Sequence, residues 1–177
     1  QRQRQTPKPP KMRKKIHVYN TETRPLYQWR KTSQDLVNAW VPDTMVVDSS
    51  ASSVIDNTCW NTVDIKEIFL WSDCIKPDWT VINKIWSFAI WLSAWNSGVP
   101  LYVVGSLLKI DVVDKIWIET RSGKELWPEA PDWLNIVNFA FDRITHKCIT
   151  WIVTEFWVIR PENLMRAVKK YYPRMLE

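Results

Sequence analysis

The sequence predicts a mainly β protein: a single antiparallel β-sandwich of jelly-roll type, with a disordered basic N-terminal arm and a short C-terminal amphipathic helix. Three observations predict this class. Short β-prone runs recur between turn residues, long helical patterns are scarce before residue 160, and the positive charge lies at the chain ends. We therefore divide the chain into an arm (1–15), a β-sandwich body (16–159) and a basic amphipathic helix (160–177).

The arm carries seven positive charges and no acid, interleaved with Gln and three prolines. Such a composition buries too little apolar surface to offset chain entropy, so we expect disorder. An unfolded cationic segment is typical of nucleic-acid binding, because counterion release gives sequence-independent affinity. The predicted nucleic-acid-binding residues are Arg2, Arg4, Lys8, Lys11, Arg13, Lys14 and Lys15. A solubilising or nuclear-targeting tail is the alternative.

The first part of the body contains two predicted strands and a helix. Residues 15–20 (KIHVYN) and 44–48 (TMVVD) are β-prone runs bounded by Pro, Asp or Ser. Between them, residues 32–40 predict a helix of about two turns, because Thr or Ser can cap it and Pro42 stops it. The serine-rich run 49–53 predicts a loop.

The longest apolar run, residues 85–108, carries no charge and is long enough to span a bilayer. Its middle, residues 96–100 (NSGVP), has the composition of a turn and divides the run into two pieces of about ten residues. Two adjacent buried strands joined by this turn are therefore expected, with a spanning helix as the alternative.

Further β-prone runs complete the predicted sandwich. They cover 64–71, 110–119, 135–141 and 148–159, with turns at 121–124 and 142–147. After the last run, Pro161 and Glu162 suit the first turn of a helix. Apolar residues then recur at helical spacing between Leu164 and Tyr172, which predicts the amphipathic helix.

The sequence offers few residues for catalysis or metal binding. It has two histidines, and its three cysteines, Cys59, Cys74 and Cys148, lack the spacing of a zinc site. The three glycines, at 98, 105 and 123, form no phosphate-binding loop motif. We therefore predict no catalytic residue, no metal site and no cofactor, and a protein that is not an enzyme.

Aromatic residues are abundant, with 13 tryptophans against three glycines. Most are expected in the core, and the surplus is expected at subunit contacts, where Trp is a favoured anchor. Trp29, beside Arg30 and Lys31, is the candidate platform for stacking on unpaired bases. A tryptophan covered by its own loop is the alternative.

The segregated charge favours an assembly protein, since residues 16–159 hold 12 basic and 17 acidic side chains. A cationic, proline-bearing arm before a β-rich body without catalytic motifs resembles the plan of small single-jelly-roll capsid proteins. The resemblance implies a viral coat subunit that self-associates through its sandwich and packages nucleic acid, RNA in preference to DNA. It also implies a location in the virion and in the host cytoplasm or nucleus, with no membrane partner.

Two other function classes fit parts of the pattern. A ribosomal or ribonucleoprotein subunit would use the same basic tail, although such proteins generally carry positive charge on the globular face as well. A membrane-associated matrix or adaptor protein would bind anionic lipid through the arm and through Lys169, Lys170, Tyr171 and Tyr172.

Overall fold

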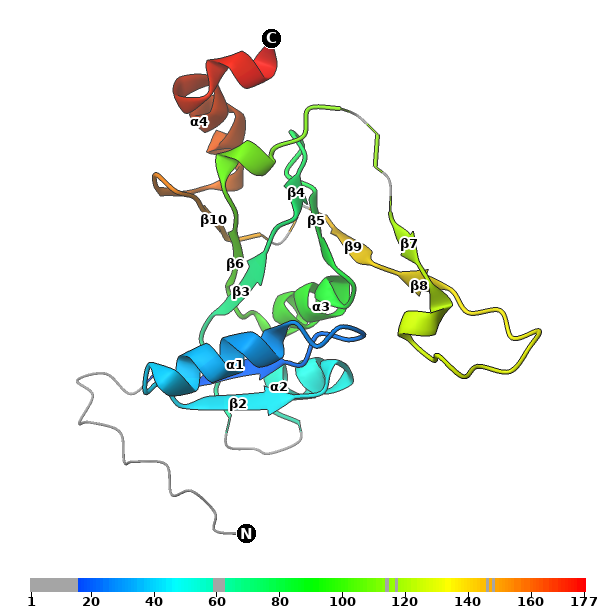
Figure 1. Cartoon of the computed structure of the whole chain (residues 1–177). Helices are drawn as coiled ribbons and strands as arrows, with labels where there is room; N and C mark the ends of the chain where they lie inside the picture. Colours follow the sequence, from blue (N-terminus) through cyan, green and yellow to red (C-terminus); the bar gives the residue numbers. More distant parts are fainter. Residues whose placement is uncertain (1–15, 59–62, 114, 117, 146, 148) are drawn as a thin grey trace. The chain divides into compact units, whose positions relative to one another are not determined.

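The computed structural model describes residues 16–58, 63–113, 115–116, 118–145, 147 and 149–177 (Figure 1). The chain divides into two compact units, Gln1–Ala51 and Ser52–Glu177. In the first unit, strands β1 (Val18–Thr21) and β2 (Asp43–Val46) pair in parallel, and helix α1 (Trp29–Asn38) connects them. A parallel pair needs such a crossover, because its strands run in the same direction. The short 3-10 helix η1 (Asp48–Ser50) follows β2.

Polar side chains hold the first unit together. The Asn20 side-chain amide donates to Ser33 Oγ and to Asp43 Oδ1, both at 2.8 Å, and so joins β1, α1 and β2. The Asp48 carboxylate accepts from the backbone N–H groups of Thr23 (2.8 Å) and Arg24 (2.6 Å). These bonds fix the turn after β1, where the chain leaves the strand toward α1.

The main sheet of the second unit has the strand order β11-β10-β6-β3. Strands β3 (Ile68–Trp71), β6 (Leu101–Val104) and β10 (Trp151–Val153) are parallel, and β11 (Val158–Ile159) pairs antiparallel with β10. Figure 1 shows β3, β6 and β10 side by side. Helix α3 (Ser87–Ser97) lies on the β3-to-β6 connection and makes it a β-α-β crossover. Helix α2 (Ala51–Ile55) precedes this sheet in the chain.

The second unit also contains smaller elements. An antiparallel sheet contains β4 (Cys74–Ile75), β5 (Val81–Lys84) and β9 (Phe141–Ile144), and a two-stranded sheet contains β7 (Thr120–Arg121) and β8 (Asn138–Phe139). Two 3-10 turns, η2 (Leu107–Lys109) and η3 (Gly123–Glu125), lie in the connections. The chain ends with η5 (Pro161–Asn163), helix α4 (Leu164–Tyr171) and η6 (Pro173–Leu176).

The core of the second unit joins its two larger sheets to α4. Its least exposed side chains, at 1% or less, are Ile75, Val81, Leu101, Val103, Leu107, Ile144, Ile152, Leu164 and Val168. They come from β4, β5, β6, η2, β9, β10 and α4. Pro161 precedes α4, and the helix buries Leu164 and Val168 in this core.

The predicted antiparallel jelly-roll sandwich is wrong, because the central strands are parallel and are connected through a helix. Residues 87–97, expected as a strand, form α3, whose apolar residues are spread round the helix and therefore show no helical period. Residues 49–53, expected as a loop, lie in η1 and α2. Of the described residues in 110–119, none belongs to a strand, and Ile110 makes an isolated bridge to Ile75.

Other local expectations correspond to elements of the structure. The predicted turn at residues 96–100 falls where α3 ends and β6 begins, and α1 begins three residues earlier than predicted. Among the residues that the structure describes, no helix is long and apolar enough to cross a membrane. The arm, residues 1–15, lies outside the described residues, and the division of the chain at 15 and 159 stays a prediction.

Candidate active site

Polar side chains stand just past the carboxyl ends of all three parallel strands of the second unit. Asp73 follows β3, Ser106 follows β6 and Glu155 follows β10, each by two residues. In open α/β sheets, ligands bind outside the carboxyl ends of the strands. This edge of the sheet is therefore the first place to look for a functional site.

Glu155 serves the fold at this edge. Its carboxylate accepts hydrogen bonds from the Ser106 hydroxyl (2.9 Å), the Leu107 N–H (3.0 Å) and the Tyr172 hydroxyl (3.0 Å). Burial raises the pKa of Glu155, but the hydrogen bonds that its carboxylate accepts outweigh this effect and leave the pKa below its usual range. The carboxylate therefore stays ionised at neutral pH and ties β10 to η2 and to the end of α4.

Asp73 has a different environment, with an exposed side chain and a fixed backbone. Its N–H donates to the Ile82 carbonyl (2.9 Å), which attaches the end of β3 to β5. The preceding Ser72 is fully buried, and both its N–H (2.9 Å) and its hydroxyl (3.4 Å) donate to the Val104 carbonyl of β6. The backbone under Asp73 is thus fixed by two strands, while its carboxylate faces solvent.

The end of β5 carries a buried amide–hydroxyl pair next to Asp73. The Asn83 amide donates to Ser87 Oγ (2.8 Å), and the Ser87 hydroxyl donates to the Lys84 carbonyl (2.7 Å). Asn83 and Ser87 are 8% and 4% exposed, so neither side chain can swing away from this position. The pair fixes the turn from β5 into α3 and leaves Lys84 partly exposed beside it.

Charged groups flank the start of α3. The Phe88 N–H in its first turn donates to the Asp142 carboxylate of β9 (3.0 Å), a favourable position for an anion at a helix N-terminus. The Lys84 ammonium lies 5.2 Å from the centroid of the Phe141 ring. A carboxylate, an ammonium and a helix N-terminus therefore lie along the β5–α3 turn, near the backbone attachment of Asp73.

Lys76 and Cys74 lie on the β4–β5 hairpin, and both have structural roles. Lys76 is 5% exposed, and its ammonium donates to the Asp111 carboxylate and to the carbonyls of Val113 and Lys115. Burial raises the pKa of the Cys74 thiol, which therefore stays protonated at neutral pH. Neither residue is a candidate nucleophile.

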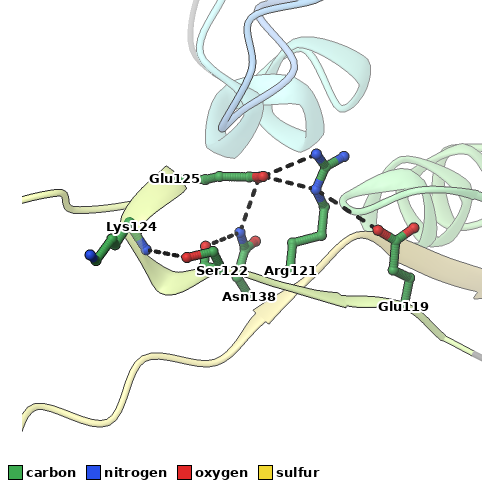
Figure 2. Close-up of polar contacts among 6 residues, drawn as sticks. All are labelled: Glu119, Arg121, Ser122, Lys124, Glu125 and Asn138. Atoms are coloured by element: carbon green, nitrogen blue, oxygen red, sulfur yellow. Dashed lines mark hydrogen bonds and ion pairs between the residues drawn. The ribbon is translucent and has the colours of Figure 1, made fainter.

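A second polar cluster lies on the β7–β8 hairpin and is shown in Figure 2. The Glu125 carboxylate accepts from the Arg121 guanidinium (3.0 Å) and from the Asn138 amide (3.5 Å), and that amide also donates to the Ser122 carbonyl (3.1 Å). Lys124 takes part through its backbone N–H, which donates to Ser122 Oγ (3.3 Å). All these bonds stay within the hairpin, so we interpret the cluster as structural.

A pocket of about 460 Å³ lies at the amino end of β10, away from Glu155 and its edge of the sheet. It is lined by Trp79, Lys147, Ile149, Thr150, Trp151, Arg160, Pro161 and Glu162. The Arg160 guanidinium lies 5.4 Å from the Trp151 ring centroid. Among the described residues, no group of three or more His, Cys, Asp or Glu side chains is arranged to hold a metal ion.

None of the residues that the sequence predicts as functional is among the described residues that form this site. The arm cations Arg2 to Lys15 fall outside the described residues. Trp29, Arg30 and Lys31 lie in the first turn of α1, in the other unit, where the Arg30 guanidinium covers the Tyr27 ring at 3.6 Å and Lys31 pairs with Asp35 at 2.8 Å. Stacking of Trp29 on bases stays a prediction.

Sequence reasoning missed Asp73, Asn83, Lys84 and Ser87. One signal was available, because Asp73 follows the β-prone run 64–71 and the carboxyl end of a strand is a common place for a functional acid. That signal applies to a parallel sheet, whereas the sequence pattern predicts antiparallel strands.

Curated relatives of this chain are bacterial isomerases. The chain is 37% identical over 160 residues to methylthioribose-1-phosphate isomerase of Natranaerobius thermophilus, covering 85% of this chain and 45% of that protein. It is 33% identical over 166 residues to 5-deoxyribose 1-phosphate isomerase of Moorella thermoacetica, covering 88% and 46%. The chain thus spans about half the length of the curated relatives it matches.

The chain is also similar to solved structures of two kinds, a translation initiation factor subunit and an isomerase. The translation initiation factor eIF-2B, subunit delta, from A. fulgidus matches with a TM-score of 0.76 and 28% identity, over 88% of this chain and 47% of that one. The 5-methylthioribose 1-phosphate isomerase of Pyrococcus horikoshii matches with a TM-score of 0.76 and 26% identity, over 88% and 46%. Both are neighbours of the Rossmann-like α/β type, which agrees with the parallel sheet found here.

These findings overturn the functional predictions. The viral coat subunit is wrong, together with its virion location and its partners, packaged nucleic acid and copies of itself in a coat, because the relatives are bacterial isomerases. The expectation of a protein that is not an enzyme is overturned by the same relatives. The ribonucleoprotein and membrane-adaptor alternatives find no support among them.

The family assignment rests on most of the chain. A family model described as "Initiation factor 2 subunit family" matches residues 8–161, which include both strands of the first unit and all strands of the second. Five of the seven arm cations, from Lys8 to Lys15, lie inside this match. The chain belongs to the initiation factor 2 subunit family.

Proposed function

We propose that this chain is the part of a sugar-phosphate isomerase that carries its proton-transferring carboxylate, Asp73. The substrate class is a pentose 1-phosphate, as in the names of the bacterial relatives at 37% and 33% identity. One observation supports the proposal most directly: the exposed Asp73 carboxylate stands at the carboxyl end of β3, on a backbone bonded to β5.

Sugar isomerisation leaves the atomic composition unchanged and relocates hydrogen within the substrate. A carboxylate that accepts a proton and returns it at a neighbouring atom fits this requirement. Asp73 is suited to this role because its backbone is held by two strands. A catalytic group that is already held in position loses less entropy when it reaches the reactive geometry.

The β5–α3 turn supplies the complementary charge. Lys84 offers an ammonium for a phosphate group, and the Asn83–Ser87 pair keeps the turn rigid. Asp142 already accepts the Phe88 N–H, so we assign the phosphate to Lys84 and not to the start of α3. In this arrangement Lys84 orients the substrate while Asp73 moves the proton.

The direct test incubates the purified chain with methylthioribose-1-phosphate and with 5-deoxyribose 1-phosphate, and follows conversion to the ketose by NMR. We expect Asp73→Asn to lower kcat by about 10²–10⁴-fold. Lys84→Met should mainly raise KM. Asp64→Asn is the matched control, because Asp64 is an exposed carboxylate paired with Lys66, and it should leave both constants unchanged. Full activity of Asp73→Asn would contradict the proposed role.

A second candidate function follows from the A. fulgidus structure, which is a translation initiation factor subunit with the same TM-score as the isomerase. A protein of that type would use this fold without turnover. Absence of ketose from the unsubstituted chain, with both sugar phosphates, would favour it over the isomerase.

A further inference from the structure

Among the tryptophans that the structure describes, four have a left-handed backbone conformation. The φ angles are 60° at Trp40, 69° at Trp79, 88° at Trp86 and 72° at Trp133. Positive φ is uncommon for any residue with a Cβ atom and is a genuine outlier for a bulky one. Glycine adopts this conformation without steric cost. These four positions therefore have the backbone conformation that glycine adopts most readily.

The hydrogen bonds at the C-terminal end of α1 form a pattern in which glycine is the usual residue. The Trp40 N–H donates to the Val37 carbonyl (3.1 Å) and the Val41 N–H donates to the Leu36 carbonyl (2.9 Å). This is the Schellman pattern, in which the left-handed position is usually glycine. Trp40 occupies that position.

Helix α3 ends in the same way with a glycine. The Gly98 N–H donates to the Trp95 carbonyl (3.3 Å), the Val99 N–H donates to the Ala94 carbonyl (2.9 Å), and Gly98 has a φ of 66°. The same motif thus ends both helices, with Trp40 in the left-handed position after α1 and Gly98 in that position after α3.

Two turns also have tryptophan at a position where glycine is usual. Pro77-Asp78-Trp79 and Pro131-Asp132-Trp133 share the sequence Pro-Asp-Trp, and the tryptophan is left-handed in both. Pro-Asp-Gly is a common turn sequence, because Pro sets the first φ, Asp bonds the backbone and Gly supplies positive φ. Trp133 is 102% exposed, so no packing offsets its backbone strain.

Trp86 shows a second sign of misfit. It stands directly before α3, and its buried indole N–H has no hydrogen-bond partner among the described residues. A buried indole N–H normally finds an acceptor. A glycine at this position would remove both the strain and the unsatisfied donor.

The amino-acid composition also indicates that tryptophan stands at positions where glycine is expected. The chain has three glycines, whereas average usage near 7% would give about 12. It has 13 tryptophans, a surplus of similar size. A single codon can account for this, because UGA is read as tryptophan in some genetic codes and as glycine in others, while UGG is the ordinary tryptophan codon.

We propose that residues 40, 79, 86 and 133 are glycine positions of this fold, that their codon is UGA, and that the producing organism reads this codon as glycine. The proposal rests on backbone geometry and composition, independently of the isomerase function.

Its first test is chemical: the four codons are read from the gene, and the peptides that contain them are analysed by mass spectrometry of protein from the producing organism. UGA codons with glycine in the peptides are the expected result. UGG codons, or tryptophan in the peptides, would overturn the proposal.

The second test isolates the backbone strain at the two helix ends. Trp40→Gly is compared with Trp40→Ala, since both lack the indole and only glycine relieves the positive φ. We expect the folded-to-unfolded ratio to be about 5–30-fold higher for glycine. Gly98→Ala is the matched control and should lose stability by a similar factor. Equal stability of Trp40→Gly and Trp40→Ala, with a clear loss in Gly98→Ala, would overturn the assignment of residue 40.

Discussion

The Lys76 ammonium donates a 2.7 Å hydrogen bond to the Asp111 carboxylate, and the two side chains differ sharply in exposure, at 6% and 43%. The carbonyls of Val113 (2.6 Å) and Lys115 (3.0 Å) accept the remaining ammonium protons. Lys76 thereby ties the β4–β5 hairpin to the segment that leaves η2. A buried cation with three acceptors makes this contact sensitive to the loss of any of them.

Asp111→Asn should therefore destabilise the protein more than Lys76→Met. The first change leaves a buried ammonium with a neutral partner, and we expect a loss of about 1 kcal/mol, limited by the exposure of the carboxylate. The second change removes the buried charge itself and leaves Asp111 solvated. Urea unfolding of both variants measures the difference. A larger loss for Lys76→Met would show that the aliphatic stem and the carbonyl bonds dominate.

The same pair predicts a pH dependence of stability. The hydrogen bond from Lys76, followed by that from the Val113 N–H, lowers the pKa of Asp111. A folded-state pKa below the unfolded value of about 3.9 gives a contribution that is complete above that pH and is lost as the pH falls through the folded pKa. The stability difference between the unsubstituted protein and Asp111→Asn should thus be constant near neutral pH and shrink below about pH 4. A difference that persists unchanged in acid would contradict this assignment.

The local sequence predicted several turns and strands well, and α3 shows why the topology escaped it. The turn at 96–100 and strand β6 were recognised from Gly98, Pro100 and the Val-rich run. Within α3, apolar residues occupy so many positions that neither a helical nor a strand period stands out. Gly98 is a typical residue after a helix, and it was the one cue for the correct assignment.

Recognition of the candidate site from the sequence requires the correct assignment of α3. Without a crossover helix between residues 71 and 101, the sequence pattern predicts antiparallel strands, and in such a sheet the acid after β3 has no special place. The backbone hydrogen bond from Asp73 to Ile82 follows from the β4–β5 hairpin. The position of Asp73 at the carboxyl end of a parallel sheet follows from the long-range pairing of β3 with β6. Such non-local pairing is not encoded in any short window of sequence.

The reactivity of Cys74 should respond to both members of the Lys76–Asp111 pair. Burial raises the pKa of this thiol most, Lys76 opposes that shift, and Asp111 adds to it. Removing the cation in Lys76→Met should slow alkylation of Cys74 by iodoacetamide, and removing the anion in Asp111→Asn should speed it, because the thiolate is the reactive form. Mass spectrometry of the peptide containing Cys74 gives both rates at neutral pH. Equal rates in the two variants would show that burial alone sets this pKa.

The β7–β8 hairpin should loosen when Glu125 is replaced. Its carboxylate links the Arg121 guanidinium to the Asn138 amide (Figure 2), so Glu125→Ala removes a bond from each strand. We expect faster amide exchange at residues 120–125 with a change in global stability below about 1 kcal/mol, because the ion pair is partly exposed. Lys124→Ala is the control, since Lys124 contributes a backbone N–H to the cluster, and exchange should stay as it was.

Glu155 should be more important for stability than its exposure suggests. It accepts from Ser106, Leu107 and Tyr172, and Leu107 is buried, so its N–H has no easy replacement partner. Glu155→Gln should cost about 1 kcal/mol, and Tyr172→Phe, which removes one of the three donors, should cost less. Glu162→Gln serves as the control, because Glu162 is an exposed carboxylate that takes no part in these hydrogen bonds. Thermal unfolding of the three variants ranks them.

Acid should erase the advantage of Glu155. The pKa of this carboxylate lies below the ordinary glutamate value of about 4.3, because the hydrogen bonds that it accepts outweigh the effect of burial. Its contribution is therefore fully present above that pH and is lost as the pH falls through the lowered pKa. We expect the stability curves of the unsubstituted protein and Glu155→Gln to run parallel at neutral pH and to converge below about pH 4. Parallel curves down to the lowest pH would mean that Glu155 acts through packing, with no contribution from its charge.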